Sequence, residues 1–413
     1  AKQSCDMGGV VAASLGTRIA YIVTDPADSF TVLSTCLEKD SLYDFSKPWI
    51  GDGLVTARYS IWKNHRKLLN PAFSQTLLDT YMGVFNSQSR KMVTDLEKEI
   101  GKGLFDHWTY IRRNTFESIC STSLGVDFTH SNLNNTYMKA MEQMFHIFTE
   151  RLMKFWWHSP YIFAWSDLKK KQDACVKKLI NISDTVRRLY LRSTKCKPFI
   201  DILLELSAEQ GVFTDKQIRE HVDTLLGAGH DTSANVLMFS MILLGSHPEA
   251  QEKIKEILGE DRDVEKTDLS KLVYLEAFLK EGMRMLPPVP ILARKLDTDV
   301  KLTNCTLSAG RTCALFIFAM QKHPSWGPDA HEFKPERWLE PGKLPDNPHA
   351  FAAFSLGKRQ CIGRAYALMS MKTTLAHVVR RYRIQADYTK VRLKFDVMLK
   401  PDAGHYISIE RRT

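Results

Sequence analysis

Residues 354–363 of the chain read Phe-Ser-Leu-Gly-Lys-Arg-Gln-Cys-Ile-Gly. A helical pattern follows from Gly363 to about Tyr382, so this loop delivers Cys361 to the start of a helix. Because a helix N-terminus favours an anion, the cysteine can be held as a thiolate, the form that binds a metal. The alternative is that Cys361 is one more small buried hydrophobe, the usual fate of a free cysteine.

Helical patterns extend outward from this loop over most of the chain. The longest begins at Thr214, a plausible N-cap, and ends near Leu244. At 1.5 Å per residue, its roughly 30 residues would cross a domain of this size. Further helices are expected at 248–258 and at 270–286, where two prolines end the pattern.

Strand patterns are short and lie at the margins of the chain. One strand is expected at 19–25. Two hairpins are expected, one within 305–318 that turns at 308–310, and one within 393–410 that turns at 401–404. The predicted fold class is therefore mainly α with small β-sheets.

Composition is that of a globular protein. Hydrophobic residues make up 44% of the 413 residues and charged residues 25%, enough apolar surface for a large core. No internal repeat, low-complexity tract or Gly/Ser linker divides the chain, so residues 1–413 are expected to form one domain. The eight cysteines show no C-x-x-C spacing, the pattern of zinc and dithiol sites, which favours a reducing compartment.

Net charge and hydropathy limit the kinds of partner that the protein is expected to bind. Lys and Arg outnumber Asp and Glu by 57 to 47, which would attract nucleic acid, an anionic membrane or an acidic protein. No dense basic run is interleaved with aromatic residues, so we expect no nucleic acid. The longest apolar stretch, 236–244, is far short of the roughly 20 residues that span a bilayer. The sequence starts at Ala1 without a targeting segment, so we expect an N-terminally truncated chain.

The loop at 354–363 resembles the haem-binding signature of the cytochromes P450, F-x-x-G-x-R-x-C-x-G, at every specified position. The resemblance implies haem b as the cofactor and Cys361 as the axial ligand of its iron. Thiolate ligation pushes electron density onto iron and favours cleavage of the O–O bond. Phe354 would shield the sulfur, Arg359 would reach a propionate, and Gly357 and Gly363 would let the backbone approach the flat macrocycle.

Residues 228–233, Ala-Gly-His-Asp-Thr-Ser, lie midway along the long helix and resemble the oxygen-activation motif of that family. Gly229 costs about 1 kcal/mol against Ala in a helix, so the missing side chain should have a use. The Thr232 hydroxyl can bond the carbonyl of Ala228, four residues back, and open the helix for water or dioxygen. The resemblance implies that Asp231 and Thr232 pass protons to oxygen.

Three further motifs follow the order of the P450 family. Glu281 and Arg284, three residues apart, and the Pro-Glu-Arg motif with Arg337 resemble a structural ion cluster that supports the cysteine loop. Trp62 and Arg66 resemble the W-x-x-x-R helix that binds a haem propionate. The segment from Pro288 resembles the one that passes over the haem, and its Arg294 is expected at another propionate. Its apolar residues and two others are expected near substrate: Leu54, Leu225, Val289 and Ile291.

The motif around the long helix is similar to that of the microsomal family-four group, known for fatty acids, other lipids and, in insects, xenobiotics. Many members carry a Glu that esterifies the haem at the position of Ala228, so we expect haem to be held here without that bond. Membership implies a membrane surface on the cytosolic face of the endoplasmic reticulum. It also implies electrons from NADPH through NADPH–cytochrome P450 reductase, with cytochrome b5 as a second candidate partner. The reductase is expected to dock on basic residues: Lys63, Lys67, Lys358 and Arg364.

Two other functions are compatible with parts of the sequence. One is a haem-thiolate isomerase or dehydratase that works without a reductase, although Asp231 and Thr232 argue for oxygen activation. The other is a haem-binding scaffold or gas sensor without enzymatic activity. Consumption of NADPH with reductase distinguishes these from a monooxygenase, which would insert one atom of O₂ into a hydrophobic small molecule.

Overall fold

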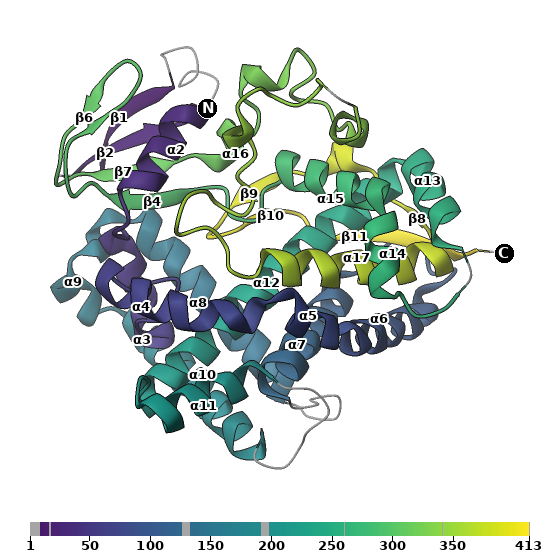
Figure 1. Cartoon of the computed structure of the whole chain (residues 1–413), viewed down its shortest axis with the longest axis horizontal. Coiled ribbons are helices and arrows are strands. Elements are labelled where there is room, and N and C mark those ends of the chain that lie inside the picture. Colours follow the sequence, from purple (N-terminus) through teal and green to yellow (C-terminus); the bar gives the residue numbers. More distant parts are fainter. Residues whose placement is uncertain are drawn as a thin grey trace.

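Helices dominate the fold (Figure 1). The computed structural model describes residues 9–15, 18–125, 133–190, 198–259, 261–340 and 342–412. The longer helices are α2 (Pro26–Thr35), α4 (Tyr59–Leu69), α6 (Met82–Leu96), α7 (Trp108–Leu124), α8 (Leu133–Met153), α10 (Asp167–Tyr190), α11 (Phe199–Gln210), α12 (Asp215–Ser246), α13 (Pro248–Leu258), α15 (Val273–Met285) and α17 (Arg364–Arg381). Shorter ones are α3 (Lys47–Ile50), α5 (Gln75–Thr80), α9 (Pro160–Ala164), α14 (Lys266–Lys271) and α16 (Ile317–Met320). The predicted helical class is confirmed.

The long helix α12 lies at the centre of the molecule, as its length predicted (Figure 1). Its N-cap is Thr214, whose hydroxyl accepts from the backbone N–H of Gln217, while the Gln217 side chain accepts from the backbone N–H of Thr214. This reciprocal capping box satisfies two donors that a helix otherwise leaves free. The following helix, α13, starts at Pro248, as predicted.

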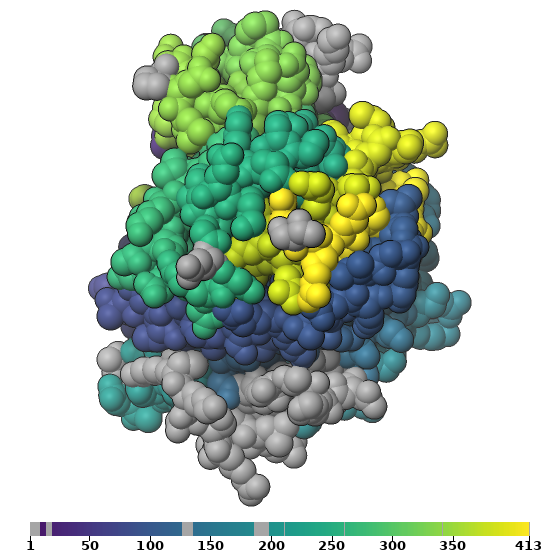
Figure 2. All heavy atoms as spheres, turned by 90° about the vertical axis from the view of Figure 1, so that its right-hand side faces the viewer, coloured from purple at the N-terminus to yellow at the C-terminus, as the bar shows by residue number. Residues whose placement is uncertain are grey.

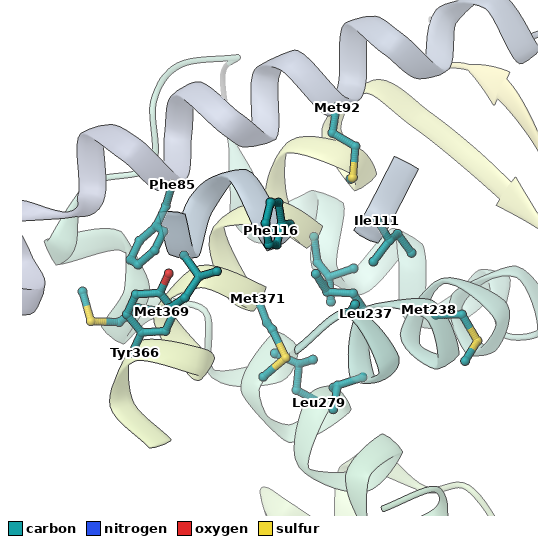
Figure 3. Packing of buried hydrophobic residues seen from close by; sticks show 14 of the residues in the cluster. Phe85, Met92, Ile111, Phe116, Leu237, Met238, Leu279, Tyr366, Met369 and Met371 are labelled. Atoms are coloured by element: carbon teal, nitrogen blue, oxygen red, sulfur yellow. The ribbon is translucent and has the colours of Figure 1, made fainter. Parts of the chain in front are cut away.

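The hydrophobic core lies where α12 meets α6, α7, α15 and α17. Figure 3 shows side chains from all five helices interdigitating, including Phe85, Phe116, Leu237, Leu279 and Met371. Each of these five side chains is 2% exposed or less. Burying a side chain of this size contributes about 1.5–3 kcal/mol, so this cluster is the main stabilising contact of the fold.

Four small sheets lie around the helices. The largest has the strand order β1 (Val10–Leu15), β2 (Arg18–Val23), β7 (Thr312–Leu315) and β4 (Leu292–Lys295). The others pair β9 (Leu393–Phe395) with β10 (Leu399–Pro401), β11 (Tyr406–Arg411) with β3 (Phe105–Asp106) and β8 (Tyr382–Gln385), and β5 (Val300–Lys301) with β6 (Thr306–Leu307).

Both predicted hairpins were wrong in their pairing. Strand β7 does not pair with β6 but lies between β2 and β4, which pair its backbone groups on both edges, and its alternate residues Cys313 and Leu315 are fully buried. In the second segment, β9 and β10 turn at Asp396–Met398, where the N–H of Asp396 donates to the carbonyl of Met398. The chain also turns at 401–404, but β11 beyond it joins another sheet.

The predicted helix at 270–286 is two helices. Leu272 has a non-helical conformation and separates α14 from α15, and a capping box at Glu265 starts α14 earlier than expected. The C-terminal strand β11 then closes one face of the molecule. In Figure 2 the C-terminal residues, in yellow, lie between the region of α13 and that of α6. Arg412 pairs with Glu252 of α13 at 2.9 Å, and Arg411 pairs with Glu97, beyond α6, at 3.0 Å.

Candidate active site

The cysteine loop is held in shape by its own backbone. The N–H of Cys361 donates to the carbonyl of Phe354 at 2.8 Å, and Gly363 is the N-cap of α17. Cys361 is exposed to solvent on one side. Burial on the other sides raises the pKa of its thiol, while the Gly363 N–H and the cations Arg66 and Arg364 lower the pKa. These three groups are the ones that would stabilise a thiolate.

The two loop glycines have different roles. Gly357 has φ +69°, and a Cβ there would lie 2.8 Å from the carbonyl oxygen of Leu33 in α2. Its missing side chain therefore allows the contact with α2, and its expected role beside a macrocycle stays a prediction. At Gly363 a Cβ would meet only the Cys361 sulfur, at 3.9 Å, so this position does border the candidate iron site.

Cationic side chains gather beside the loop. Arg359 donates to the carbonyls of Leu37 and Ala57 and lies over the Trp62 ring, its Cζ 4.4 Å from the ring centroid. Its Nη1 is buried without a hydrogen-bond partner in the described structure. Arg294 is fully buried and its Nε likewise has no partner among the described residues. Two unpartnered buried guanidinium nitrogens therefore lie on this side of the loop.

The charges of this cluster act on one another. Burial, and next the charge of Arg294, lower the pKa of Arg359 to about 10. On α4, Arg66 donates to the carbonyl of Gln360 in the loop at 2.9 Å. Cations that are buried together with free donors are the environment in which an anion binds. The residues present therefore fit the two carboxylates of a haem.

One member of this cluster was missed by the sequence reasoning. Lys39 forms an isolated β-bridge with Arg294, and its ammonium lies 4.3 Å from the centroid of the Tyr43 ring. Burial, and then the charges of Arg294 and Arg359, lower its pKa well below the usual value. No spacing signal could have found Lys39, because it meets Arg294 only through the fold.

The motif on α12 includes the least buried residues in the middle of that helix. Leu225, Gly229 and Thr232 are partly exposed and Ala228 is exposed, whereas the rest of the helix from His230 to Leu244 is buried. Positions three, four and seven apart lie on one face of a helix, so these residues form a stripe. The Thr232 hydroxyl donates to the carbonyl of Ala228 at 2.7 Å, the bond expected from the sequence.

Residues in that stripe and next to it have different roles. A Cβ at Gly229 would lie 2.9 Å from Ile119, so Gly229 lets α7 approach α12. Asp231 is 2% exposed, its Oδ2 has no hydrogen-bond partner in the described ranges, and burial raises its pKa. Lys400 and Arg112 are the cations that lower this pKa, and neither was expected. Asn235 fixes the strand of Lys400 by donating to the Leu399 carbonyl at 2.6 Å.

The predicted ion cluster is formed and completely buried. Glu281 accepts two hydrogen bonds from Arg284, both at 2.8 Å, and one from Arg337 at 2.9 Å. It also accepts from the backbone N–H of Lys334 and from the Trp338 indole. Arg284 in turn donates to three carbonyls of the chain between α16 and η6 (Pro335–Trp338): Gln321, Ala330 and Glu332. The cluster therefore fastens α15 to the chain that leads to the cysteine loop.

The residues predicted to line a substrate site are all only partly buried. Leu54, Leu225 and Val289 are half-buried, and Ile291 is 48% exposed. Leu54 and Leu225 pack at the edge of the main core. Their part in substrate binding stays a prediction.

Comparison with known proteins defines the class. A family model for Cytochrome P450 matches residues 2–407. The chain therefore belongs to the cytochrome P450 family, and it is a P450 monooxygenase. Membership implies a haem cofactor.

The relatives then narrow the identification to family four. The chain is 31% identical to Cytochrome P450 4V2 of Mus musculus over 421 residues, which cover 95% of this chain and 80% of the relative. It is 30% identical to the protein of that name in Homo sapiens, covering 91% and 77%. It is 29% identical to Cytochrome P450 4c3 of Drosophila melanogaster, covering 96% and 81%. This confirms the resemblance to the family-four group.

Proposed function

We propose that this P450 oxidises a hydrophobic small molecule, a fatty acid, another lipid or a xenobiotic, with electrons from NADPH delivered by NADPH–cytochrome P450 reductase. Haem would lie between the Cys361 loop and α12, with Cys361 as the iron ligand. The observation that carries this proposal is the incompletely buried stripe in the middle of α12, between residues that are buried. When bound, the haem supplies the iron centre at which dioxygen is activated.

The residues of the chain would hold that group without a covalent ester. Arg66, Arg294 and Arg359 would bind its propionates beside Trp62. Ala228 offers only a methyl group on the stripe. The nearest carboxylate before it, Asp223, is fully buried and accepts a hydrogen bond from Ser183. Acidified organic solvent would therefore strip the haem unmodified.

Turnover with purified reductase tests the reaction class. We expect product formation that requires NADPH, reductase and O₂ together. Rearrangement of a peroxide without reductase would instead support the isomerase or dehydratase. A spin-shift screen of fatty acids, terpenoids and insecticides would then identify the substrate class, since a bound substrate displaces water from the iron.

Thr232 and Asp231 would deliver protons. In Thr232→Ala the hydroxyl that donates to the Ala228 carbonyl is lost, so electrons should be diverted to peroxide by about 10-fold or more. The measurement is product formed per NADPH consumed. Thr224→Ala is the matched control, because Thr224 makes the same bond to Glu220, at 2.7 Å, two turns earlier. Equal coupling in both variants would remove Thr232 from the mechanism.

The reductase would dock on the side of the cysteine loop. Lys63, Lys67, Lys358 and Arg364 are all exposed, and none forms an ion pair within the described ranges. Unpaired basic side chains steer an acidic partner and raise the rate of association. NADPH itself would bind the reductase and not this chain, and cytochrome b5 would compete for the same face.

Charge reversal tests this surface. Lys63→Glu with Lys358→Glu should slow reduction by the reductase roughly 10-fold at low salt and flatten its salt dependence, because screening acts over about 10 Å at 0.1 M. Stopped-flow reduction measures the rate. The pair Lys139→Glu with Lys177→Glu, which changes exposed cations of α8 and α10, is the control. Equal rates for both pairs would contradict the docking surface.

A membrane surface would be the second partner, on the cytosolic face of the endoplasmic reticulum. Among the described helices, none is long and apolar enough to cross a bilayer. Large apolar side chains are nevertheless exposed together between α8 and α10: Leu152, Met153, Phe155, Trp156, Tyr161, Ile162 and Trp165. Such a patch is rare on the surface of a monomer and favours a membrane or protein contact.

A further inference from the structure

Arg151 is a buried cation whose donors are unused. It lies in the last turn of α8 and is 7% exposed. Six other arginines are buried to a similar degree, and each makes at least one hydrogen bond: Arg112, Arg284, Arg294, Arg337, Arg359 and Arg380. In the part of the chain that the structure describes, Arg151 makes none, although a guanidinium has five N–H donors.

Two aromatic rings lie against this guanidinium. Its Cζ lies 3.9 Å from the centroid of Phe45 in η1 (Ser41–Ser46) and 3.6 Å from that of Phe163 in α9. Cation–π contacts stabilise the charge but provide no acceptor for its N–H donors. An oxyanion that approaches these donors would complete the environment.

The nearby acids are already paired. Glu150, the neighbour of Arg151, pairs with Lys154, and Asp44, the neighbour of Phe45, pairs with Lys47 at 3.0 Å. Burial is the one cause that shifts the pKa of Arg151, to about 10, so the group stays charged at neutral pH. A buried charge without a counterion is costly, and its partner is therefore expected from outside the chain.

A second unused nitrogen belongs to another residue that contacts Phe45. The ring of His158, in η4 (Phe155–His158), lies 5.3 Å from that of Phe45, and its Nε2 is buried without a hydrogen-bond partner among the described residues. Arg151 and His158 thus contact the same phenylalanine. One surplus cation and one free imidazole nitrogen are suitable ligands for a phosphate oxyanion.

The surroundings indicate where this anion comes from. The exposed apolar residues of the proposed membrane contact belong to the same segment, and they include Met153, Tyr161 and Trp165 at 77%, 82% and 91% exposure. A group that binds there is at the depth of lipid head groups when these side chains enter a bilayer. Charge complementarity then favours a net anionic phospholipid.

We propose that Arg151 and His158, with Phe45 and Phe163, form a binding site for the phosphate of an anionic phospholipid. The inference rests on the proposed membrane contact and adds a lipid-selective site to it. A bound lipid would tie α8, η1 and α9 together, three elements that Arg151 contacts or belongs to.

Vesicle flotation of the full chain, with haem bound, tests the site. The probes are vesicles of phosphatidylcholine alone and of phosphatidylcholine with phosphatidylserine, each at low salt and at about 1 M salt, where screening acts within about 3 Å. Wild type should prefer the anionic vesicles under both conditions. Arg151→Met, which keeps an apolar stem between the rings, should reduce this preference about fivefold or more at both salt concentrations, and His158→Gln should reduce it less.

Lys170→Gln is the matched control, because Lys170 is a 79% exposed cation at the start of α10. Its effect should disappear at high salt, whereas that of Arg151 persists because the site is buried. Equal behaviour of the two variants would overturn the lipid site. So would a loss of laurate spin shift in Arg151→Met with unchanged vesicle binding, which would assign the cation to substrate. Failure of wild type to float with phosphatidylcholine alone would instead count against the apolar membrane contact.

Discussion

Cys361→Ala should abolish the strongly red-shifted Soret band of the ferrous carbon-monoxide complex. The band depends on thiolate ligation, and the loop offers no second sulfur, since residues 354–363 contain one cysteine. The thiol that would be lost is the one whose pKa the Gly363 N–H and the charges of Arg66 and Arg364 lower, against the effect of burial. Absorbance of the carbon-monoxide complex, normalised to folded protein by circular dichroism, measures the loss.

Cys305→Ala is the control for this experiment. Cys305 is the other exposed free cysteine among the described residues, and it lies in the turn before β6. Its removal should leave the band unchanged. An unaltered band in Cys361→Ala would disprove the central assignment, and a wild-type complex that absorbs like a globin would indicate histidine ligation.

Glu281→Gln should lower the free energy of unfolding by about 3–5 kcal/mol, because it leaves the buried guanidinium of Arg284 without its anion and leaves Arg337 with Asp329 alone, at 3.3 Å. Arg284 and Arg337 are 0% and 4% exposed, so water cannot replace the lost charge. Unfolding in urea, followed by circular dichroism, measures the change. The segment that leads to the cysteine loop should also loosen, which would lower the amount of haem bound.

Glu332→Gln is the control, because it also removes one carboxylate charge but from an exposed side chain. The Glu332 side chain is 61% exposed and pairs with Lys334 at 2.8 Å, a contact worth at most about 1 kcal/mol. A small effect in this variant beside a large effect in Glu281→Gln would establish that burial makes the difference. If both variants unfold at the same urea concentration, the cluster does not stabilise the fold.

Local patterns predicted the helices well and the strand partners poorly. The capping residue Thr214 and the stop at Pro248 are encoded within a few positions of the helix ends that they define. Strand β7 instead finds β2, almost 300 residues earlier in the chain, and a turn motif carries no information on such a partner. The same limit explains why Thr232 and its Ala228 carbonyl were predicted, whereas Lys39 was not.

The role of a residue was also harder to predict than its place. The loop motif drew attention to Gly357 and Arg359, and both lie beside Cys361 in sequence. Their contacts are nevertheless with α2 and the chain after it: Gly357 packs against Leu33, and Arg359 donates to Leu37 and Ala57. A motif records that a residue is required, but only the fold shows which neighbour requires it.

The hydrogen bonds of Arg359 have a consequence for how the protein folds during its synthesis. They join residues 322 and 302 positions apart, and the bond between Arg66 and Gln360 spans 294. A ribosome must therefore release nearly the whole chain before the cysteine loop meets the surfaces that shape it. Contacts of such sequence separation form slowly, after local helices. The protein would thus bind its iron cofactor late, after most of the chain has been synthesised. A nascent chain arrested on the ribosome before residue 363 would not contain the cofactor.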